Sequence, residues 1–207
     1  MVTSSFSAIR PDPEPADRAA GSPAVLVRAV QFKELIKVAD ILTESFHSQG
    51  GINFWLNPLF RLGIYEDLRT RMQSISPHYI CLVAIASNPL NLPVSDRPII
   101  GTVEMGSKSP SVGQNLASRC LYLSNLAVSP PYRRQGVAAQ LLHRCEEIAL
   151  EWGFNELFLH VLENNQAAKQ LYFHHGYRLQ YIEPYWMSWF FWRPRRMLLH
   201  KHIAGCR

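Results

Sequence analysis

Apolar residues recur along this chain with two different spacings, and these spacings predict an alternation of strands and helices. The clearest helix is expected over Arg134–Trp152, where apolar side chains return every three or four positions and form one stripe. Gln31–Phe46 shows the same helical spacing. By contrast, Tyr79–Ala86 is almost continuously apolar, which is typical of a central strand covered on both faces.

The segments between these elements complete the expected order. Further strands are expected at Ala24–Val30, Pro98–Met105, Cys120–Val128, Leu157–Leu162, Tyr177–Tyr181 and Trp192–His200. Two more helices are expected, one from Pro58 to about Ser74 and one over Asn165–His174, and Gly153 and Gly176 are expected to end helices. The order is strand, two helices, three strands, helix, strand, helix and two strands, which indicates one mixed α/β domain.

The first 24 residues differ in composition from the rest of the chain. They are rich in Pro, Ser and Ala, with no apolar periodicity, so we expect a mobile tail at 1–24 followed by one domain at 25–207. A plastid targeting segment is poor in acidic residues, whereas the three acids of this stretch outnumber its two arginines. The composition therefore favours a plain tail over a targeting segment.

Composition and charge narrow the class of protein. The 207 residues are 47% hydrophobic and 18% charged, which is ordinary for a globular domain. No apolar run reaches the roughly 18 residues that a membrane-spanning helix needs, and we expect no membrane partner. The formal net charge is +5, and residues 193–207 hold five cations and no acid. A basic end can bind nucleic acid, but we favour a solvated strand edge and expect no nucleic-acid partner, since no zinc-finger or RNP-type signature is present.

The cysteines and histidines suggest neither disulfides nor a metal. Cys81, Cys120, Cys145 and Cys206 form no CxxC pair, and three of them fall on apolar faces of expected elements, so we expect small buried thiols. No secretory signal appears, and a reducing compartment, the cytoplasm, is therefore expected. The eight histidines show no HExxH or other metal-ligand spacing, which predicts no metal.

A candidate anion-binding site lies where the strand that ends at Val128 passes through a Pro-Pro turn into the long helix. The helix is expected to open with Arg133-Arg-Gln-Gly136-Val-Ala138. The first turn of a helix has unpaired N–H groups and the positive end of the helix dipole. Small residues there let a diphosphate touch the backbone, and arginines add charge. The chain has neither the GxxxxGK[ST] motif nor the GxGxxG motif. The sequence therefore does not favour a nucleoside triphosphate or a nicotinamide dinucleotide as the ligand.

These residues resemble the signature of the GNAT family of acetyl-CoA-dependent N-acetyltransferases. Arg133, Gly136 and Ala138 match one family motif, and a second segment, Asn165-Gln-Ala-Ala-Lys-Gln-Leu-Tyr172-Phe-His-His-Gly176-Tyr177, follows at the family's spacing. The phrase Tyr122-Leu-Ser-Asn-Leu-Ala-Val128 is similar to the plastid and cyanobacterial branch, which adds the plastid stroma as an alternative location. The resemblance implies a mixed, mostly antiparallel central sheet flanked by helices, with a splay between the fourth and fifth strands.

The resemblance also assigns residues to the co-substrate. It implies that acetyl-CoA is bound by Leu126, Ala127, Val128, Arg133, Arg134, Gln135, Gly136, Val137, Ala138, Ala139, Asn165 and Tyr172. The first three would pair with the pantetheine arm through their main chain, and the amides of 135–139 would hold the pyrophosphate. Ser124 and Asn125 interrupt the apolar pattern of the preceding strand. A β-bulge would fit this interruption, and so would a solvent-facing polar pair.

Two residues are the catalytic candidates. Tyr172 resembles the family's general acid, which protonates the departing thiolate; as a lone tyrosine it would otherwise be read as a core residue. Glu104, on an expected strand, is the candidate base that takes a proton from the amine, directly or through water, although an ordinary surface glutamate fits the same position. His160 and His174 are the alternative bases.

The resemblance therefore predicts acetyl transfer from acetyl-CoA to a primary amine by direct attack in a ternary complex. Protein lysines and N-terminal amines are the expected acceptors by resemblance to the plastid branch. A small amine is the alternative substrate, and a non-catalytic acyl-CoA-binding regulator is the alternative class. The aromatic run of the expected last hairpin would line the acceptor slot or pack as an ordinary hairpin; it holds Tyr185, Trp186, Trp189, Phe190, Phe191 and Trp192.

Overall fold

A computed structural model of the chain describes residues 25–47, 57–74, 76, 78–86, 93, 97–108, 120–183 and 194–203. Within these ranges one seven-stranded sheet has the order β1-β2-β3-β4-β5-β7-β6. The strands are β1 Val25–Ala29, β2 Tyr79–Ala86, β3 Ile99–Lys108, β4 Cys120–Val128, β5 Glu156–Leu162, β6 Arg178–Ile182 and β7 Arg196–His202. Only β4 and β5 pair in parallel among the described strands.

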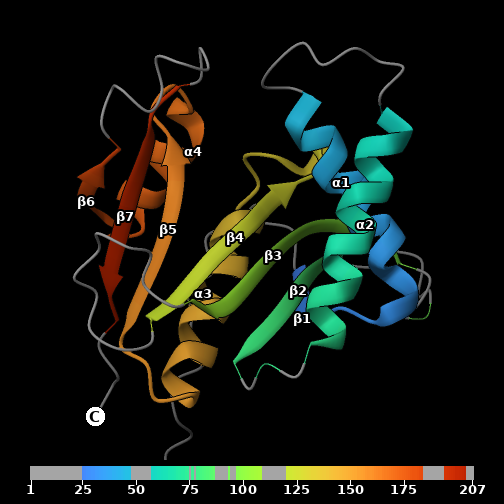
Figure 1. Cartoon of the computed structure of the whole chain (residues 1–207), viewed down its shortest axis with the longest axis horizontal. Coiled ribbons are helices and arrows are strands. Elements are labelled where there is room, and N and C mark those ends of the chain that lie inside the picture. Colours follow the sequence, from blue (N-terminus) through green and yellow to red (C-terminus); the bar gives the residue numbers. More distant parts are fainter. Residues whose placement is uncertain are drawn as a thin grey trace, which may run out of the picture.

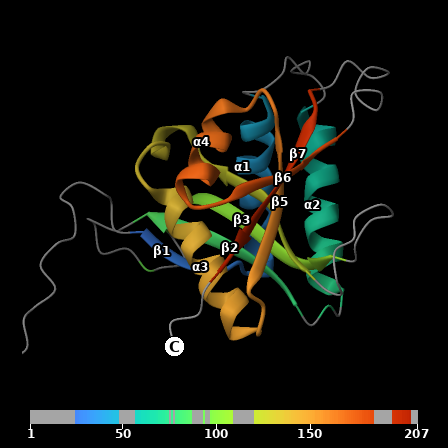
Figure 2. The same ribbon diagram turned by 90° about the vertical axis from the view of Figure 1, so that its left-hand side faces the viewer.

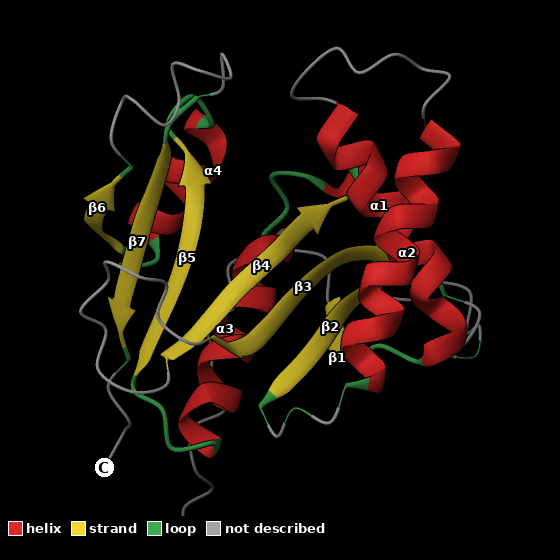
Figure 3. Ribbon diagram, in the orientation of Figure 1, coloured by secondary structure: helices red, strands yellow, loops and turns green. Residues whose placement is uncertain are grey.

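Four α-helices of the described chain cover the two faces of this sheet (Figures 1 and 2). They are α1 Leu35–His47, α2 Asn57–Gln73, α3 Val137–Glu151 and α4 Gln166–His174. On one face α1 and α2 pack over β1–β4, where Leu42 of α1 shares a core cluster with Val83 of β2. On the other face lie α3 and α4, and Leu141 of α3 shares a second cluster with Leu121 of β4 and Tyr172 of α4. Figure 3 shows this arrangement by secondary structure.

The predicted order of strands and helices is confirmed, and so is the mixed, mostly antiparallel sheet. The bounds of β2 and β4 coincide with the predicted ones. The glycines predicted to end helices, Gly153 and Gly176, have φ angles of 80° and 82°, which L-residues with side chains rarely adopt. The beginning of the predicted last strand, from Trp192 to residue 193, lies outside the described residues, and β7 starts at Arg196.

The start of α3 was predicted wrongly. The helix begins at Val137 rather than at Arg134, because two residues of the preceding turn have left-handed backbone angles. Arg134 has φ 62° and Gly136 has φ 79°, and neither angle belongs to a right-handed helix. The arginines therefore stand on a turn before the helix instead of in its first turn.

The buried thiols expected from the sequence are confirmed for three of the four cysteines. Cys81, Cys120 and Cys145 are free and buried, and Cys206 lies outside the described residues. Burial raises the pKa of the Cys81 thiol to about 12 and that of Cys145 as well. Both remain protonated and inaccessible at neutral pH, which makes them poor nucleophiles.

The division of the chain at residue 24 stays a prediction, and truncation tests it. A protein that starts at Ala24 keeps all of β1, whose residues pair with β2 from Val25↔Ala86 to Ala29↔Leu82. We therefore expect it to have the melting temperature of the full chain and the same affinity for CoA. Thermal unfolding and calorimetric titration on both proteins measure this. A clear drop in melting temperature would show that residues 1–23 contribute to the fold.

Candidate active site

The sheet forks between its two parallel strands. β4 and β5 pair only at Leu121↔Leu157, Tyr122↔Phe158 and Leu123↔Leu159, after which the strands diverge (Figure 1). The predicted splay between the fourth and fifth strands is thus confirmed. It begins where β4 loses its regular pairing with β3 on the opposite side.

A β-bulge in β4 marks this point. Thr102 pairs with Ala127 but Glu104 pairs with Ser124, so β4 has one more residue than β3 in this interval. Asn125, inside it, has φ 53°. A bulge bends its strand and increases its twist, which turns β4 away from β5. Of the two interpretations left open by the sequence, the bulge is confirmed.

A cavity of about 200 Å³ occupies the fork. It is bordered by α1 on one face of the sheet and by α3 and α4 on the other. The lining residues are Leu42, Ser45, Leu123, Ser124, Asn125, Leu126, Ala127, Leu142, His160, Val161, Leu162, Asn165, Ala168 and Tyr172. Two reactants approaching from opposite faces of the sheet could therefore meet inside it.

Tyr172 lies in this cavity, as a catalytic phenol must. Its side chain comes from α4, is 8% exposed, and meets the Tyr177 ring edge-on with the ring centroids 5.7 Å apart. Burial raises the pKa of the Tyr172 phenol above its ordinary value of 10.0, so it stays protonated at neutral pH. A protonated phenol at the wall of the cavity can donate its proton to a substrate.

Asn165 has the predicted place at the start of α4. Its Oδ1 accepts a hydrogen bond from the Ala168 amide at 3.1 Å, so Asn165 is the N-cap of the helix. The same side chain borders the cavity. Asn165 therefore fixes the helix that carries Tyr172.

The predicted phosphate-binding turn follows β4 after a short 3-10 helix, Pro130–Tyr132. Arg133 and Gln135 are held by the main chain around them: Arg133 Nε donates to the Val128 carbonyl at 3.0 Å, and Gln135 Nε2 donates to the Pro131 carbonyl at 2.9 Å. The N-cap of α3 is Gly136, and no side chain caps the helix, so the N–H groups of its first turn remain available to an anion. The role of Arg133 in bracing the end of β4 was not anticipated from the sequence.

Gly101 of β3 lets the start of α3 approach the sheet. A Cβ at this position would lie 3.2 Å from the side chains of Val137 and Leu141 and 3.1 Å from the Ala127 carbonyl. The first turn of α3 and the end of β4 are therefore placed by the same glycine. No residue larger than glycine fits without moving one of them.

We expect Gly101→Val to weaken acetyl-CoA binding, because overpacking would push α3 away from β4. Such substitutions typically cost about 1–3 kcal/mol of stability. Gly63→Ala in α2 is the matched control: it has open space, and an alanine there should be neutral or stabilising. Melting temperature and the KM for acetyl-CoA, measured on both variants, check this. If Gly101→Val and Gly63→Ala have equal KM values for acetyl-CoA, Gly101 does not position the phosphate-binding turn at the start of α3.

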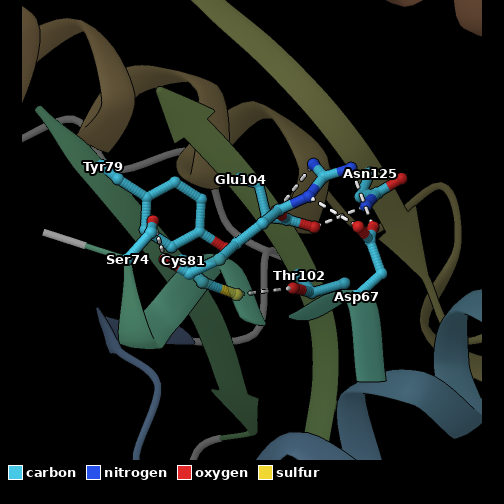
Figure 4. A network of polar contacts seen from close by, with 8 residues as sticks. Asp67, Ser74, Tyr79, Cys81, Thr102, Glu104 and Asn125 are labelled. Atoms are coloured by element: carbon cyan, nitrogen blue, oxygen red, sulfur yellow. Dashed lines mark hydrogen bonds and ion pairs between the residues drawn. The ribbon is translucent and has the colours of Figure 1, made fainter. Parts of the chain in front are cut away.

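The structure places the candidate base Glu104 in a buried polar network rather than in the cavity lining (Figure 4). Its side chain is 1% exposed. Oε2 accepts from the Tyr79 hydroxyl at 2.8 Å and from Arg71 Nη1 at 3.3 Å, while Oε1 accepts from the Asn125 side-chain amide. The burial of Tyr79, with the nearby Glu104 charge, raises the pKa of this phenol, so it remains a donor. The role of Glu104 as a base stays a prediction.

The two alternative bases are placed differently. His160 on β5 lines the cavity, and its Nδ1 lies 2.5 Å from the hydroxyl of Tyr122 on β4, across the fork. His174 is exposed at the end of α4 and is not among the described residues that border the cavity. Of the two, only His160 is positioned to meet a substrate there.

The basic end of the chain is largely paired with acids of the same chain. Arg195 lies 2.6 Å from Glu163, and Lys201 forms an ion pair with Glu146. Arg196 lies 3.8 Å from Glu183. The other two cations, at 193 and 207, lie outside the described residues, as does the aromatic run at 185–192.

None of the helices in the described part of the chain is long and apolar enough to cross a membrane. The described residues contain no group of three or more His, Cys, Asp or Glu side chains that could hold a metal ion.

A family model described as "Acetyltransferase (GNAT) family" matches residues 45–177. The chain belongs to this family. The match runs from α1 through the fork, the turn before α3 and α4, so it contains nearly all the residues that border the cavity.

Relatives and solved structures agree with this GNAT assignment. "GCN5-related N-acetyltransferase 10, chloroplastic" of Arabidopsis thaliana is 28% identical over 176 residues, which cover 83% of this chain and 68% of the relative. "GCN5-related N-acetyltransferase 7, chloroplastic", from the same plant, is 32% identical over 117 residues, 51% of this chain and 42% of the relative. The chain thus spans less than half of the latter. The PaiA N-acetyltransferase of Thermoplasma acidophilum, solved with coenzyme A, has the same fold, with a TM-score of 0.63, 16% identity, and coverage of 86% of this chain and 99% of that one.

Proposed function

We propose that this GNAT chain transfers the acetyl group of acetyl-CoA to a primary amine of a protein, either a lysine or an N-terminus. The observation that carries the proposal is the cavity at the fork, which brings the buried phenol of Tyr172 together with the bulged end of β4. Because helices of both faces border the cavity, thioester and amine can enter from opposite sides and react in one complex.

The residues of this chain fit the parts of acetyl-CoA. The uncapped amides of residues 135–139 and the charges of Arg133 and Arg134 suit the pyrophosphate. The main chain of Leu126, Ala127 and Val128 has lost its pairing with β5 and is free to pair with the pantetheine arm. Asn165 borders the same path. This binding would place the thioester beside Tyr172.

In the proposed reaction the amine nitrogen attacks the thioester carbonyl, a C–N bond forms and the C–S bond breaks. Main-chain N–H groups of the β4 bulge stabilise the charge that develops on the carbonyl oxygen. Tyr172 donates its proton to the departing sulfur. The ammonium group of the acceptor loses two protons. One goes to Glu104 through water, as predicted from the sequence, or to His160, before the attack. The other leaves the nitrogen once the C–N bond has formed and replaces the proton that Tyr172 gives to sulfur.

The lining of the cavity supports an acceptor with a single ammonium group. None of the described lining residues is an aspartate or glutamate. A small polyamine needs an anionic partner for each further ammonium group, whereas a protein N-terminus or an extended lysine presents only one charge to the cavity. This favours a protein amine over a polyamine.

The location of the protein is part of the proposal. Relatives named as chloroplastic support the plastid stroma, the alternative to the cytoplasm that was expected from the sequence. A fluorescent protein fused to the C-terminus of the full chain, imaged in plant cells, tests this: signal confined to plastids supports the stroma, and diffuse signal supports the cytoplasm.

A mass-spectrometric survey tests the proposed reaction. The purified chain is incubated with acetyl-CoA and with peptides that carry either one free N-terminus or one free lysine, and with small amines in parallel. We expect acetylated peptides and release of stoichiometric CoA. Transfer to small amines alone would overturn the protein acceptor, and CoA binding without any transfer would support a non-catalytic regulator.

A further inference from the structure

Asn125 adopts a backbone angle that needs support from its surroundings. Its φ of 53° lies in the left-handed region, which non-glycine residues rarely occupy although asparagine tolerates it best. Such residues persist where neighbouring groups hold them in place. Asn125 stands two residues after the last residue pair between β4 and β5, at Leu123↔Leu159. Whatever holds Asn125 therefore influences where the fork opens.

The group that holds Asn125 is the carboxylate of Glu104, on the neighbouring strand β3. The side-chain amide of Asn125 donates to Glu104 Oε1 (Figure 4). The carboxylate is itself fixed, since Oε2 accepts from Tyr79 of β2 at 2.8 Å and from Arg71 of α2 at 3.3 Å. Asp67 braces Arg71 in turn, at 2.7 Å. A carboxylate that is 1% exposed and held by three donors is a fixed anchor.

The bulge that this anchor supports is a wall of the reaction cavity. Residues 124–127, which carry the extra position of β4, all border the cavity, whereas Glu104 does not. A shift in the Asn125 backbone would move the peptide groups of Leu126 and Ala127. These are the groups that the proposed function assigns to the pantetheine arm.

We propose that Glu104 is a positioning residue that acts through Asn125, holding the β4 bulge in the shape that binds acetyl-CoA. The inference rests on the proposed function and replaces the role of Glu104 as a base. Both of its carboxylate oxygens accept hydrogen bonds from side chains, and its burial keeps it away from the amine. Its effect on the reaction passes through the main chain of β4.

A double-mutant cycle tests the proposal. Asn125→Gly keeps the left-handed backbone angle but removes the amide, and Glu104→Gln keeps the shape but removes the charge. We expect each single variant to raise the KM and Kd for acetyl-CoA about tenfold, the size typical of a lost charge-assisted hydrogen bond. The double variant should bind acetyl-CoA no more weakly than the weaker-binding single variant, because the two substitutions remove the same contact. The pH profile of kcat should keep its rising limb in all three.

Glu34→Gln is the matched control. Glu34 is also a buried carboxylate, 3% exposed and bound by an arginine, Arg28 at 2.6 Å, but it does not border the cavity. We expect this variant to lose stability while its KM for acetyl-CoA stays unchanged. If Glu104→Gln likewise loses stability while its KM for acetyl-CoA stays unchanged, Glu104 has an ordinary structural role and the proposal is overturned.

Other outcomes separate this proposal from the proposed function. One outcome would restore Glu104 as the base and overturn the positioning role. In it, Glu104→Gln lowers kcat by about 10²–10⁴ and removes the rising limb of the pH profile of kcat, while Asn125→Gly leaves kcat and the KM for acetyl-CoA unchanged. Additive effects of the two substitutions would overturn the coupling. If the wild-type chain binds CoA but transfers no acetyl group, the proposed function fails, yet the Kd values for CoA still decide whether Glu104 holds the bulge.

Discussion

Gly136→Asp is expected to reduce CoA affinity by about 100-fold or more. The residue has φ 79°, so any Cβ there costs about 1–2 kcal/mol of backbone strain. The aspartate also puts a negative charge beside the amides that would hold the pyrophosphate, where a repulsive contact of several kcal/mol is ordinary. Titration calorimetry with CoA measures the loss, and circular dichroism shows whether the fold persists.

Gly153→Asp is the matched control for this variant. Gly153 lies just beyond the C-terminal end of α3, has nearly the same backbone angle, φ 80°, and has open space for a Cβ. It therefore takes similar strain and the same charge far from the proposed phosphates. We expect CoA affinity to be unchanged there. A folded Gly136→Asp protein that binds CoA as the wild type does would refute the phosphate site at the start of α3.

Tyr172→Phe is expected to lower kcat by about 100-fold, near the lower end of the 10²–10⁴ range for general acid–base groups, since a thiolate is already a fair leaving group. CoA affinity should change little, because the ring is kept. Tyr177→Phe is the control: that side chain is 1% exposed, and its hydroxyl has no hydrogen-bond partner in the described part of the chain. Removing this hydroxyl should therefore leave turnover and stability intact. Turnover, CoA affinity and melting temperature are measured on both.

The raised pKa of Tyr172 gives this prediction a pH dependence. Its burial lifts the phenol pKa above 10.0, so the proton donor is present at every pH below that value and is lost only above it. Wild-type kcat should accordingly show no falling limb from this group below about pH 10. Near-wild-type turnover of Tyr172→Phe across the pH range would remove Tyr172 as the acid.

The parts of the fold that could be predicted are those governed by local patterns. Tyr79–Ala86 was bounded correctly because it is one apolar run between polar segments, and the motif around Gly136 indicated the site because its chemistry is local. The start of α3 was missed because nothing in the side chain of Arg134 reveals its φ of 62°. That angle belongs to a turn whose shape depends on contacts with the end of β4.

The environment of Glu104 could not be predicted for a different reason. Its partners Asn125, Tyr79 and Arg71 are 21, 25 and 33 positions away in sequence, on three different elements. Each of them, read alone, is an ordinary polar residue. Only the break in the apolar pattern at Ser124 and Asn125 gave a local signal. It left a bulge and a solvent-facing polar pair equally open, and it did not indicate what holds Asn125. The burial of Glu104 arises from packing, which alternation along one strand does not reveal.

The strand order has a consequence for how the protein is made on the ribosome. β7 lies between β5 and β6, so the strand that comes last in the sequence among the described strands fills a position inside the sheet. β5 pairs with β4 at three positions only and with β7 at seven, from Glu156↔His202 to Leu162↔Arg196. In a nascent chain that has not yet released β7, β5 lacks these seven pairs, and β5 carries the cavity residues His160, Val161 and Leu162. We therefore expect the reaction cavity to take its final shape only after residues 196–202 have left the ribosome.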